Sequence, residues 1–163
     1  MSLRVKFLVR FGIKKRAKMT KKNKKILTID PPATPSFETA VAAAAKGLIY
    51  VSETDAEIIP FIGKVVDAVT ARELMAQEGM SPDEPAEETA FDSFFEKLTT
   101  HKDWHGIPEK DRAAKFMKLQ ETLLANLTEL KVFRFGRVRV DIYIVGKDHD
   151  GRLAGVRTTA VET

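Results

Sequence analysis

The sequence predicts an α/β protein in which helices cover a mixed β-sheet that ends in a C-terminal β-hairpin. Apolar and polar side chains alternate along residues 138–144, which is the period of a half-buried strand. Turn chemistry follows at residues 147–152, where Asp150-Gly151 suits a tight turn. A second strand is expected at residues 153–160. Because this hairpin follows a succession of helical and strand patterns, we expect a mixed sheet with helices packed on it.

Charge divides the chain into two parts. Residues 1–25 contain eleven Lys or Arg and no Asp or Glu. Removing these from the 27 bases of the whole chain leaves 16 bases against 23 acids, a net charge of −7 for residues 26–163. We therefore expect residues 1–33 to be a disordered basic extension with a proline-rich linker, and residues 34–163 to be one folded domain. An acidic domain repels nucleic acid and attracts a basic protein.

Composition excludes several classes of protein. The chain has no cysteine, so disulfides and thiolate metal sites are excluded. No uninterrupted apolar run approaches the roughly 20 residues of a membrane span. Arg10 also interrupts any signal-peptide core. We expect a cytoplasmic protein.

Four helices are predicted from capping residues and helix breakers. Their signals are Thr34 or Ser36 followed by Gly47, Thr70 with Glu73 followed by Gly79, Asp92 before residues 93–98, and Pro108 at the start of the longest helix, which ends at about Leu127.

Further strands are predicted between the helices. Residues 48–52 are apolar and suggest a central strand, and residues 132–135 suggest another. Residues 58–62 are apolar but interrupted by proline, and Val65, Val66 and Val69 suggest another strand. Residues 81–88 predict a solvated acidic loop.

Two patterns resemble metal sites but fit loops better. His101 and His105 stand four residues apart, a helical spacing suitable for zinc, yet the surrounding residues indicate a loop with no third ligand nearby. Asp148 and Asp150-Gly151 resemble the opening of a calcium loop, but the later ligand positions do not match. The hairpin turn is the preferred interpretation of the second pattern.

No enzyme motif is present in the sequence. It contains no G-x-S-x-G, P-loop or dinucleotide fingerprint, and we predict that the protein is not an enzyme. Arginines and aromatic residues on the predicted strands could form a nucleic-acid platform on the sheet, but solvated arginines are the preferred interpretation. The platform would comprise Phe133, Arg134, Arg137, Arg139 and Tyr143.

Three positions stand out from the general pattern. Glu53 follows directly after an apolar strand, which would hold its carboxylate on a rigid element. Trp104 lies in a polar loop and is either a core plug or an interface anchor. Thr163 is the last residue, and a hairpin end without continuation can enter another protein's active site.

Several segments of the sequence resemble the nuclease A inhibitor family. The resemblance is collinear, covers roughly residues 34–163 and is most specific in its C-terminal half. The segments are GLIYVSE at 47–53, DSFF at 92–95, TT at 99–100, DW at 103–104, AKF at 114–116, DIY at 141–143, LAG at 153–155 and VET at 161–163. Lys102 departs from the uncharged polar residue expected before the Asp-Trp pair, and His105 is a second departure.

This resemblance implies a fold and a mechanism. It implies a three-layer α/β/α sandwich of the PR-1-like kind, and inhibition of a sugar-non-specific nuclease with a ββα-metal active site. Glu53 and Thr163 would reach the catalytic Mg²⁺ or Mn²⁺ of the partner. Asp103, Trp104 and Glu162 would lie at the same interface. The inhibitor would hold no cofactor of its own, would be a monomer alone and would form a heterodimer with the nuclease.

Two alternatives remain open at the level of sequence. The domain could bind some other basic protein, or the basic N-terminal tail could bind nucleic acid. The first alternative predicts a partner that is not a nuclease, and the second predicts steep salt dependence that is lost with residues 1–25.

Overall fold

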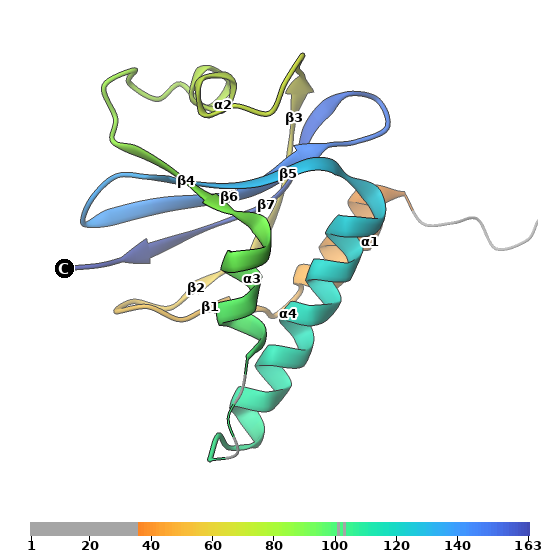
Figure 1. The fold of residues 1–163 in the computed structure, drawn as a ribbon, viewed down its shortest axis with the longest axis vertical. Coiled ribbons are helices and arrows are strands. Elements are labelled where there is room, and N and C mark those ends of the chain that lie inside the picture. Colours follow the sequence, from red (N-terminus) through yellow and green to blue (C-terminus); the bar gives the residue numbers. More distant parts are fainter. Residues whose placement is uncertain (1–35, 101, 103) are drawn as a thin grey trace, which may run out of the picture. The chain divides into compact units, whose positions relative to one another are not determined.

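The computed structural model describes residues 36–100, 102 and 104–163. Within them lie four helices, a five-stranded antiparallel sheet and a two-stranded sheet (Figure 1). The helices are α1 (Phe37–Ala45), α2 (Ala71–Glu78), α3 (Phe91–Thr99) and α4 (Ile107–Asn126). The strands are β1 (Ile49–Tyr50), β2 (Ala56–Glu57), β3 (Ile59–Val65), β4 (Ala86–Ala90), β5 (Thr128–Phe135), β6 (Arg139–Lys147) and β7 (Arg152–Val161). The extension predicted at residues 1–33 lies outside the described residues.

The large sheet has the strand order β3-β7-β6-β5-β4, and every neighbouring pair is antiparallel. The prediction of a mixed sheet was therefore wrong. Strands β5, β6 and β7 follow one another through short turns, and such turns pair strands in opposite directions. Glycines supply positive φ at both turns, 106° at Gly136 and 82° at Gly151.

The C-terminal hairpin is confirmed, with β6 and β7 paired from Arg139–Val161 to Lys147–Leu153. However, β6 is not half-buried. Ile142 is buried on one face, and Tyr143 is buried on the other at 3% exposure. The second face is covered because Tyr143 lies beneath α2, where its hydroxyl donates to Glu78 Oε1 at 3.1 Å.

Hydrophobic clusters cover both faces of the sheet. One contains apolar residues of α1, α3 and α4 together with Val132, Ile142 and Val156 of the sheet. The other contains Leu74 of α2 together with Phe133 of the sheet. Figure 1 shows α2 on one side of the sheet and the other three helices on the opposite side. The finer prediction of a three-layer, PR-1-like sandwich stays a prediction.

Helix boundaries follow the predicted capping residues with one exception. Ser36 accepts a hydrogen bond from the Thr39 amide, and Thr70 accepts one from the Glu73 amide. The cap predicted at Asp92 was wrong. Helix α3 begins at Phe91, and its N-cap residue, Ala90, makes no side-chain cap hydrogen bond. The Asp92 carboxylate lies in the first turn, where its charge still complements the helix dipole.

Residues 48–52 do not form a central strand. Strand β1 is two residues long and pairs only with β2. The chain turns back at once because the Ser52 hydroxyl donates to the Thr54 carbonyl at 2.7 Å. The apolar segment interrupted by Pro60 is β3, and an edge strand tolerates proline.

The acidic segment predicted as a loop is partly a strand. Glu87 and Glu88 belong to β4, the other edge of the sheet. Their carboxylates lie 3.7 Å from Arg134 and 3.6 Å from Lys131 on the neighbouring strand. Cross-strand charge pairs of this kind favour the pairing, and charged side chains protect an exposed edge from other chains.

Candidate functional site

The last residues of β7 lie beside the turn that connects β1 and β2. Strand β3 pairs with β7 only as far as Arg157, which leaves the final part of that edge free. The β1–β2 segment occupies it, because the Thr158 hydroxyl donates to the Glu57 carbonyl at 2.9 Å and the Val161 amide donates to Ser52 Oγ at 3.2 Å. In Figure 1 the β1–β2 turn and the C-terminal end point in the same direction.

Glu53 and Thr163 meet at this edge. The Glu53 amide donates to the Val161 carbonyl at 3.4 Å, which aligns the two segments. The Thr163 hydroxyl then donates to Glu53 Oε2 at 2.7 Å, and both residues are exposed. The structure therefore brings together the carboxylate and the chain end that the sequence pointed to, 110 residues apart. Their role stays a prediction.

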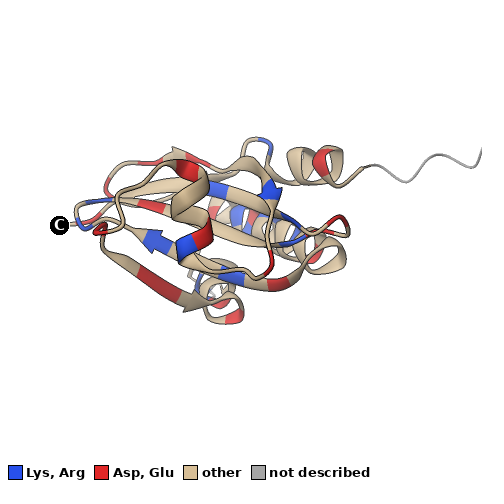
Figure 2. Cartoon of the chain, turned by 90° about the horizontal axis from the view of Figure 1, so that it is seen from above, with Lys and Arg blue, Asp and Glu red and all other residues tan. Residues whose placement is uncertain are grey.

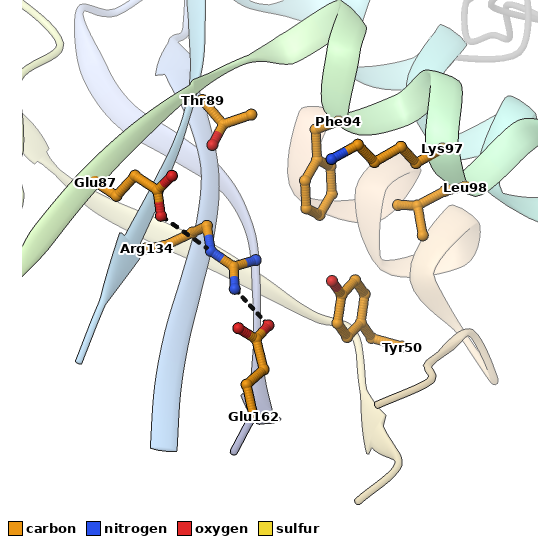
Figure 3. Close-up of a pocket in the computed structure, with 8 residues that line it drawn as sticks. All are labelled: Tyr50, Glu87, Thr89, Phe94, Lys97, Leu98, Arg134 and Glu162. Carbon is orange, nitrogen blue, oxygen red and sulfur yellow. Dashed lines mark hydrogen bonds and ion pairs between the residues drawn. The ribbon is translucent and has the colours of Figure 1, made fainter. Parts of the chain in front are cut away.

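A pocket of about 340 Å³ is lined in part by Glu162, the residue before Thr163. Figure 3 shows Arg134 between Glu87 and Glu162, with an ion pair to each carboxylate. Burial alone lowers the pKa of the Arg134 guanidinium, but hydrogen bonds and charge from Glu162 and then Tyr50 outweigh it. The net pKa is raised, so Arg134 is a permanent cation there.

The Trp104 loop lies at the far end of α3 and α4 from the sheet (Figure 1). The Trp104 side chain is 77% exposed and packs edge-on against His105, with ring centroids 4.4 Å apart. Trp104 is therefore not a core plug. Asp103 and His101 lie outside the described residues, so the predicted placement of Asp103 is untested.

A second, smaller pocket lies between the Trp104 loop and the start of the β1–β2 turn. It has a volume of about 220 Å³, and its lining includes His105 of the loop and Val51, two residues before Glu53. Its lining shares Lys97 and Leu98 of α3 with the pocket that Glu162 lines. The two predicted contact regions thus border a common surface along α3.

The nucleic-acid platform is contradicted by the structure. Tyr143 and Phe133 are 3% and 1% exposed, so neither ring can stack on a base. Arg134 is paired on the opposite face of the sheet.

Two of the residues considered as metal ligands, Asp148 and His105, have hydrogen-bond partners within the chain. The Asp148 carboxylate accepts hydrogen bonds from the amides of Asp150 and Arg152 and from Arg152 Nε, which fixes the hairpin turn. His105 Nδ1 accepts from the Lys102 amide at 3.1 Å. In the described part of the chain, no group of three or more His, Asp or Glu is placed to hold a metal ion.

No helix among the described residues is both long and apolar enough to cross a membrane.

Sequence reasoning missed Arg134 and Ser52 as parts of the site. From the sequence, Arg134 is expected to be a solvated or a nucleic-acid-binding arginine. A usable signal was its phase, since it stands two residues after the buried Val132 and so faces the same side of the strand. Ser52 had no such signal, because its bond to Val161 spans 109 residues.

The site is a projecting pair of oxygen-bearing side chains on the surface of an α/β domain. Such a surface is suited to contact with another molecule, whereas a substrate site is usually concave and mostly apolar. A family model described as nuclease A inhibitor-like protein matches residues 36–163. The chain belongs to this family, which confirms the resemblance and implies in general an inhibitor of a nuclease. A comparison with curated proteins gives no match.

Proposed function

We propose that this protein inhibits a metal-dependent, sugar-non-specific nuclease of the ββα-metal class by placing Glu53 and Thr163 at the catalytic metal. The observation that supports this most directly is the 2.7 Å contact between the Thr163 hydroxyl and Glu53 Oε2. A carboxylate and a hydroxyl from segments distant in sequence lie together on the exposed surface. The family supplies the general function, and this contact supplies the candidate residues.

The ligand chemistry fits the metal of such a nuclease. Carboxylate and hydroxyl oxygens suit Mg²⁺ and Mn²⁺, and Mg²⁺ usually keeps waters that an incoming ligand can replace or bind. The partner's ion would bridge the interface, and the inhibitor would bring no cofactor of its own. Because the pair is already formed in the free protein, little ordering entropy is lost on binding.

Electrostatics favours the same class of partner. A nuclease groove that binds phosphates is lined with Lys and Arg, and the net charge of residues 26–163 is −7. Figure 2 shows acidic and basic positions interspersed over the elements in this view. The attraction therefore comes from the net charge and from the exposed carboxylate of Glu53 at the edge, and it acts mainly on the rate of association.

The remaining predicted contacts complete the proposed interface. Trp104 is exposed on a loop, and an aromatic side chain buried on binding commonly dominates interface energetics. Asp103 would accompany it, and Glu162 would flank the metal-directed pair. In this proposal the protein is a cytoplasmic monomer with a three-layer, PR-1-like fold, forms a heterodimer with the nuclease and does not bind nucleic acid through its folded domain.

An inhibition assay tests the proposal. The protein is titrated into a ββα-metal nuclease, alongside the variants Glu53→Gln and Thr163→Val, which remove a charge and a hydroxyl with little change of shape. We expect each variant to weaken inhibition by about tenfold or more, equivalent to roughly 1.4 kcal/mol of binding free energy. Glu121→Gln, an exposed position on α4, is the matched control and should inhibit like the parent.

Other outcomes would contradict the proposal or favour one of the two alternatives. Full inhibition by both variants would reject the role of the pair at the metal. Failure of the parent protein to inhibit any ββα-metal nuclease would reject this nuclease class, and recovery of a different basic protein would favour the first alternative. DNA binding that disappears with residues 1–25 would support the second.

A further inference from the structure

Glu162 is held more firmly than a residue next to a chain end usually is, since terminal residues are poorly ordered unless they are tied down. Its amide donates to the Val138 carbonyl at 2.8 Å, which extends the pairing of β7 with β6 by one step. Its carboxylate forms an ion pair and a hydrogen bond with Arg134 of β5. Both its backbone and its side chain are therefore anchored.

Arg134 is itself fixed in place. Its side chain is only 18% exposed, and its Nε lies 3.7 Å from the Glu87 carboxylate on β4. Figure 3 shows its guanidinium in the pocket with a carboxylate on either side. An arginine held between two carboxylates loses less side-chain entropy on making each contact than a mobile surface side chain would.

The geometry connects this anchor to Thr163. Successive side chains of an extended chain point to opposite sides, so fixing the side chain of Glu162 also sets the direction of the next residue. One residue earlier, the Val161 amide and carbonyl are bonded to Ser52 and Glu53. The hydroxyl of Thr163 is then directed at the Glu53 carboxylate.

We propose that Arg134 is a positioning residue, which fixes Glu162 and thereby holds Thr163 against Glu53. In the free protein it orders the last residue. Its effect on inhibition rests on the proposed function, because the ordered pair is what would meet the partner's metal. Arg134 acts through Glu162 and Thr163 and need not touch the nuclease.

Backbone dynamics of the free protein test the positioning role. The Thr163 amide order parameter is measured by ¹⁵N relaxation in the parent, Arg134→Met and Arg134→Lys. We expect a value near that of rigid backbone, about 0.85, in the parent and below about 0.6 in Arg134→Met. Arg134→Lys restores the positive charge and should recover part of the order. Arg157→Met is the matched control, since Arg157 is also on the sheet and pairs with Glu78 at 3.5 Å on the opposite face.

Inhibition measurements then separate positioning from direct contact. Arg134→Met is combined with Thr163→Val, and inhibition of a ββα-metal nuclease is measured for each single variant and the pair. Alone, Arg134→Met should weaken inhibition by roughly tenfold, within the range of coupling found between residues of one network. Added to Thr163→Val it should cost less than about twofold more, because the positioned group is already lost. If Arg134→Met does not fold, Glu162→Gln serves in its place.

Each outcome has a distinct meaning. An unchanged Thr163 order parameter in Arg134→Met and Glu162→Gln would overturn the positioning role. Additive losses with Thr163→Val would show that Arg134 affects inhibition independently of Thr163 and would also overturn the positioning role. If the parent does not inhibit the nuclease, the proposed function fails, while the order parameter still decides whether Arg134 positions Thr163.

Discussion

Glu53 and Asp148 show how the surroundings of a carboxylate decide its use. Glu53 is exposed and accepts a side-chain hydrogen bond from Thr163, so it retains capacity for another partner. The Asp148 side chain is 0% exposed and accepts three hydrogen bonds from Asp150 and Arg152. Its oxygens are committed to the β6–β7 turn. The first carboxylate is suited to binding and the second to stability.

Replacement of Asp148 by Asn should destabilise the protein. Asn keeps the shape but loses the charge, and its NH₂ group faces hydrogen-bond donors that need an acceptor. The loss for a charged, buried partner is about 1–3 kcal/mol or more. We expect this decrease in the free energy of unfolding from urea titrations at pH 7. Asp150→Asn, at a side chain 59% exposed, is the control and should change it by less than about 0.5 kcal/mol.

The difference in the free energy of unfolding between the parent and Asp148→Asn should depend on pH. Burial raises the pKa of Asp148, but hydrogen bonds from Arg152 and Asp150 and the charge of Arg152 outweigh it, so the net pKa is lowered. A lowered pKa in the folded state means that the stabilisation is present above the unfolded-state pKa and is lost as pH falls through the folded one. The difference between the parent and Asp148→Asn should therefore be largest near neutral pH and shrink in acid. A constant difference across this range would contradict the assignment.

Among the elements, β7 sets the position of the site and tolerates little change. It lies between β3 and β6, and a Cβ added at Gly155 would lie 2.0 Å from the Ile144 carbonyl oxygen of β6. Gly155→Ala must therefore push two central strands apart. We expect a loss of about 3 kcal/mol or more in the free energy of unfolding, or failure to fold.

Gly106→Ala provides the comparison for that substitution. Its nearest neighbour would be the Glu109 carboxylate oxygen at 3.0 Å, the movable end of a flexible side chain. We expect the free energy of unfolding, measured by urea titration as above, to change by less than about 1 kcal/mol. Equal stability of the two alanine variants would show that the β6–β7 approach is not a constraint.

Elements governed by neighbours in sequence were predictable, and those governed by distant partners were not. The caps at Ser36 and Thr70 use residues three positions away, so the pattern contains the whole interaction. The place of β1 outside the large sheet depends on where β3 stops pairing with β7, which no local pattern records. The antiparallel direction of the two outer pairings, β3 with β7 and β4 with β5, was missed for the same reason.

The candidate site divides in the same way. The residue types pointed to Glu53 and Thr163 as unusual, but only the family resemblance connected them, because their contact spans 110 residues. Arg134 carried a signal in its strand phase that was interpreted as solvation. Asp103 lies outside the described residues, so its predicted position remains a prediction.

For the whole molecule, the distribution of charge makes the direction of electrostatic steering testable. The full chain has a net charge of +4, whereas residues 26–163 have −7. If the folded domain is attracted to the basic groove of a nuclease, the eleven bases of residues 1–25 oppose that attraction. Removing residues 1–33 should then increase the association rate constant with a ββα-metal nuclease at low salt. All described helices and strands lie after the cut, so the fragment should unfold with the same midpoint as the full chain.

Stopped-flow association at increasing salt is the measurement. The difference between the full chain and residues 34–163 should be several-fold at about 0.01 M salt, where the screening length is about 30 Å, and should vanish near 1 M, where it is about 3 Å. Dissociation rates should be similar for both proteins, because long-range charge acts on encounter more than on the formed complex. Slower association of residues 34–163 would mean that the basic extension contributes to binding. Both the acidic domain and the basic extension would then contact the partner.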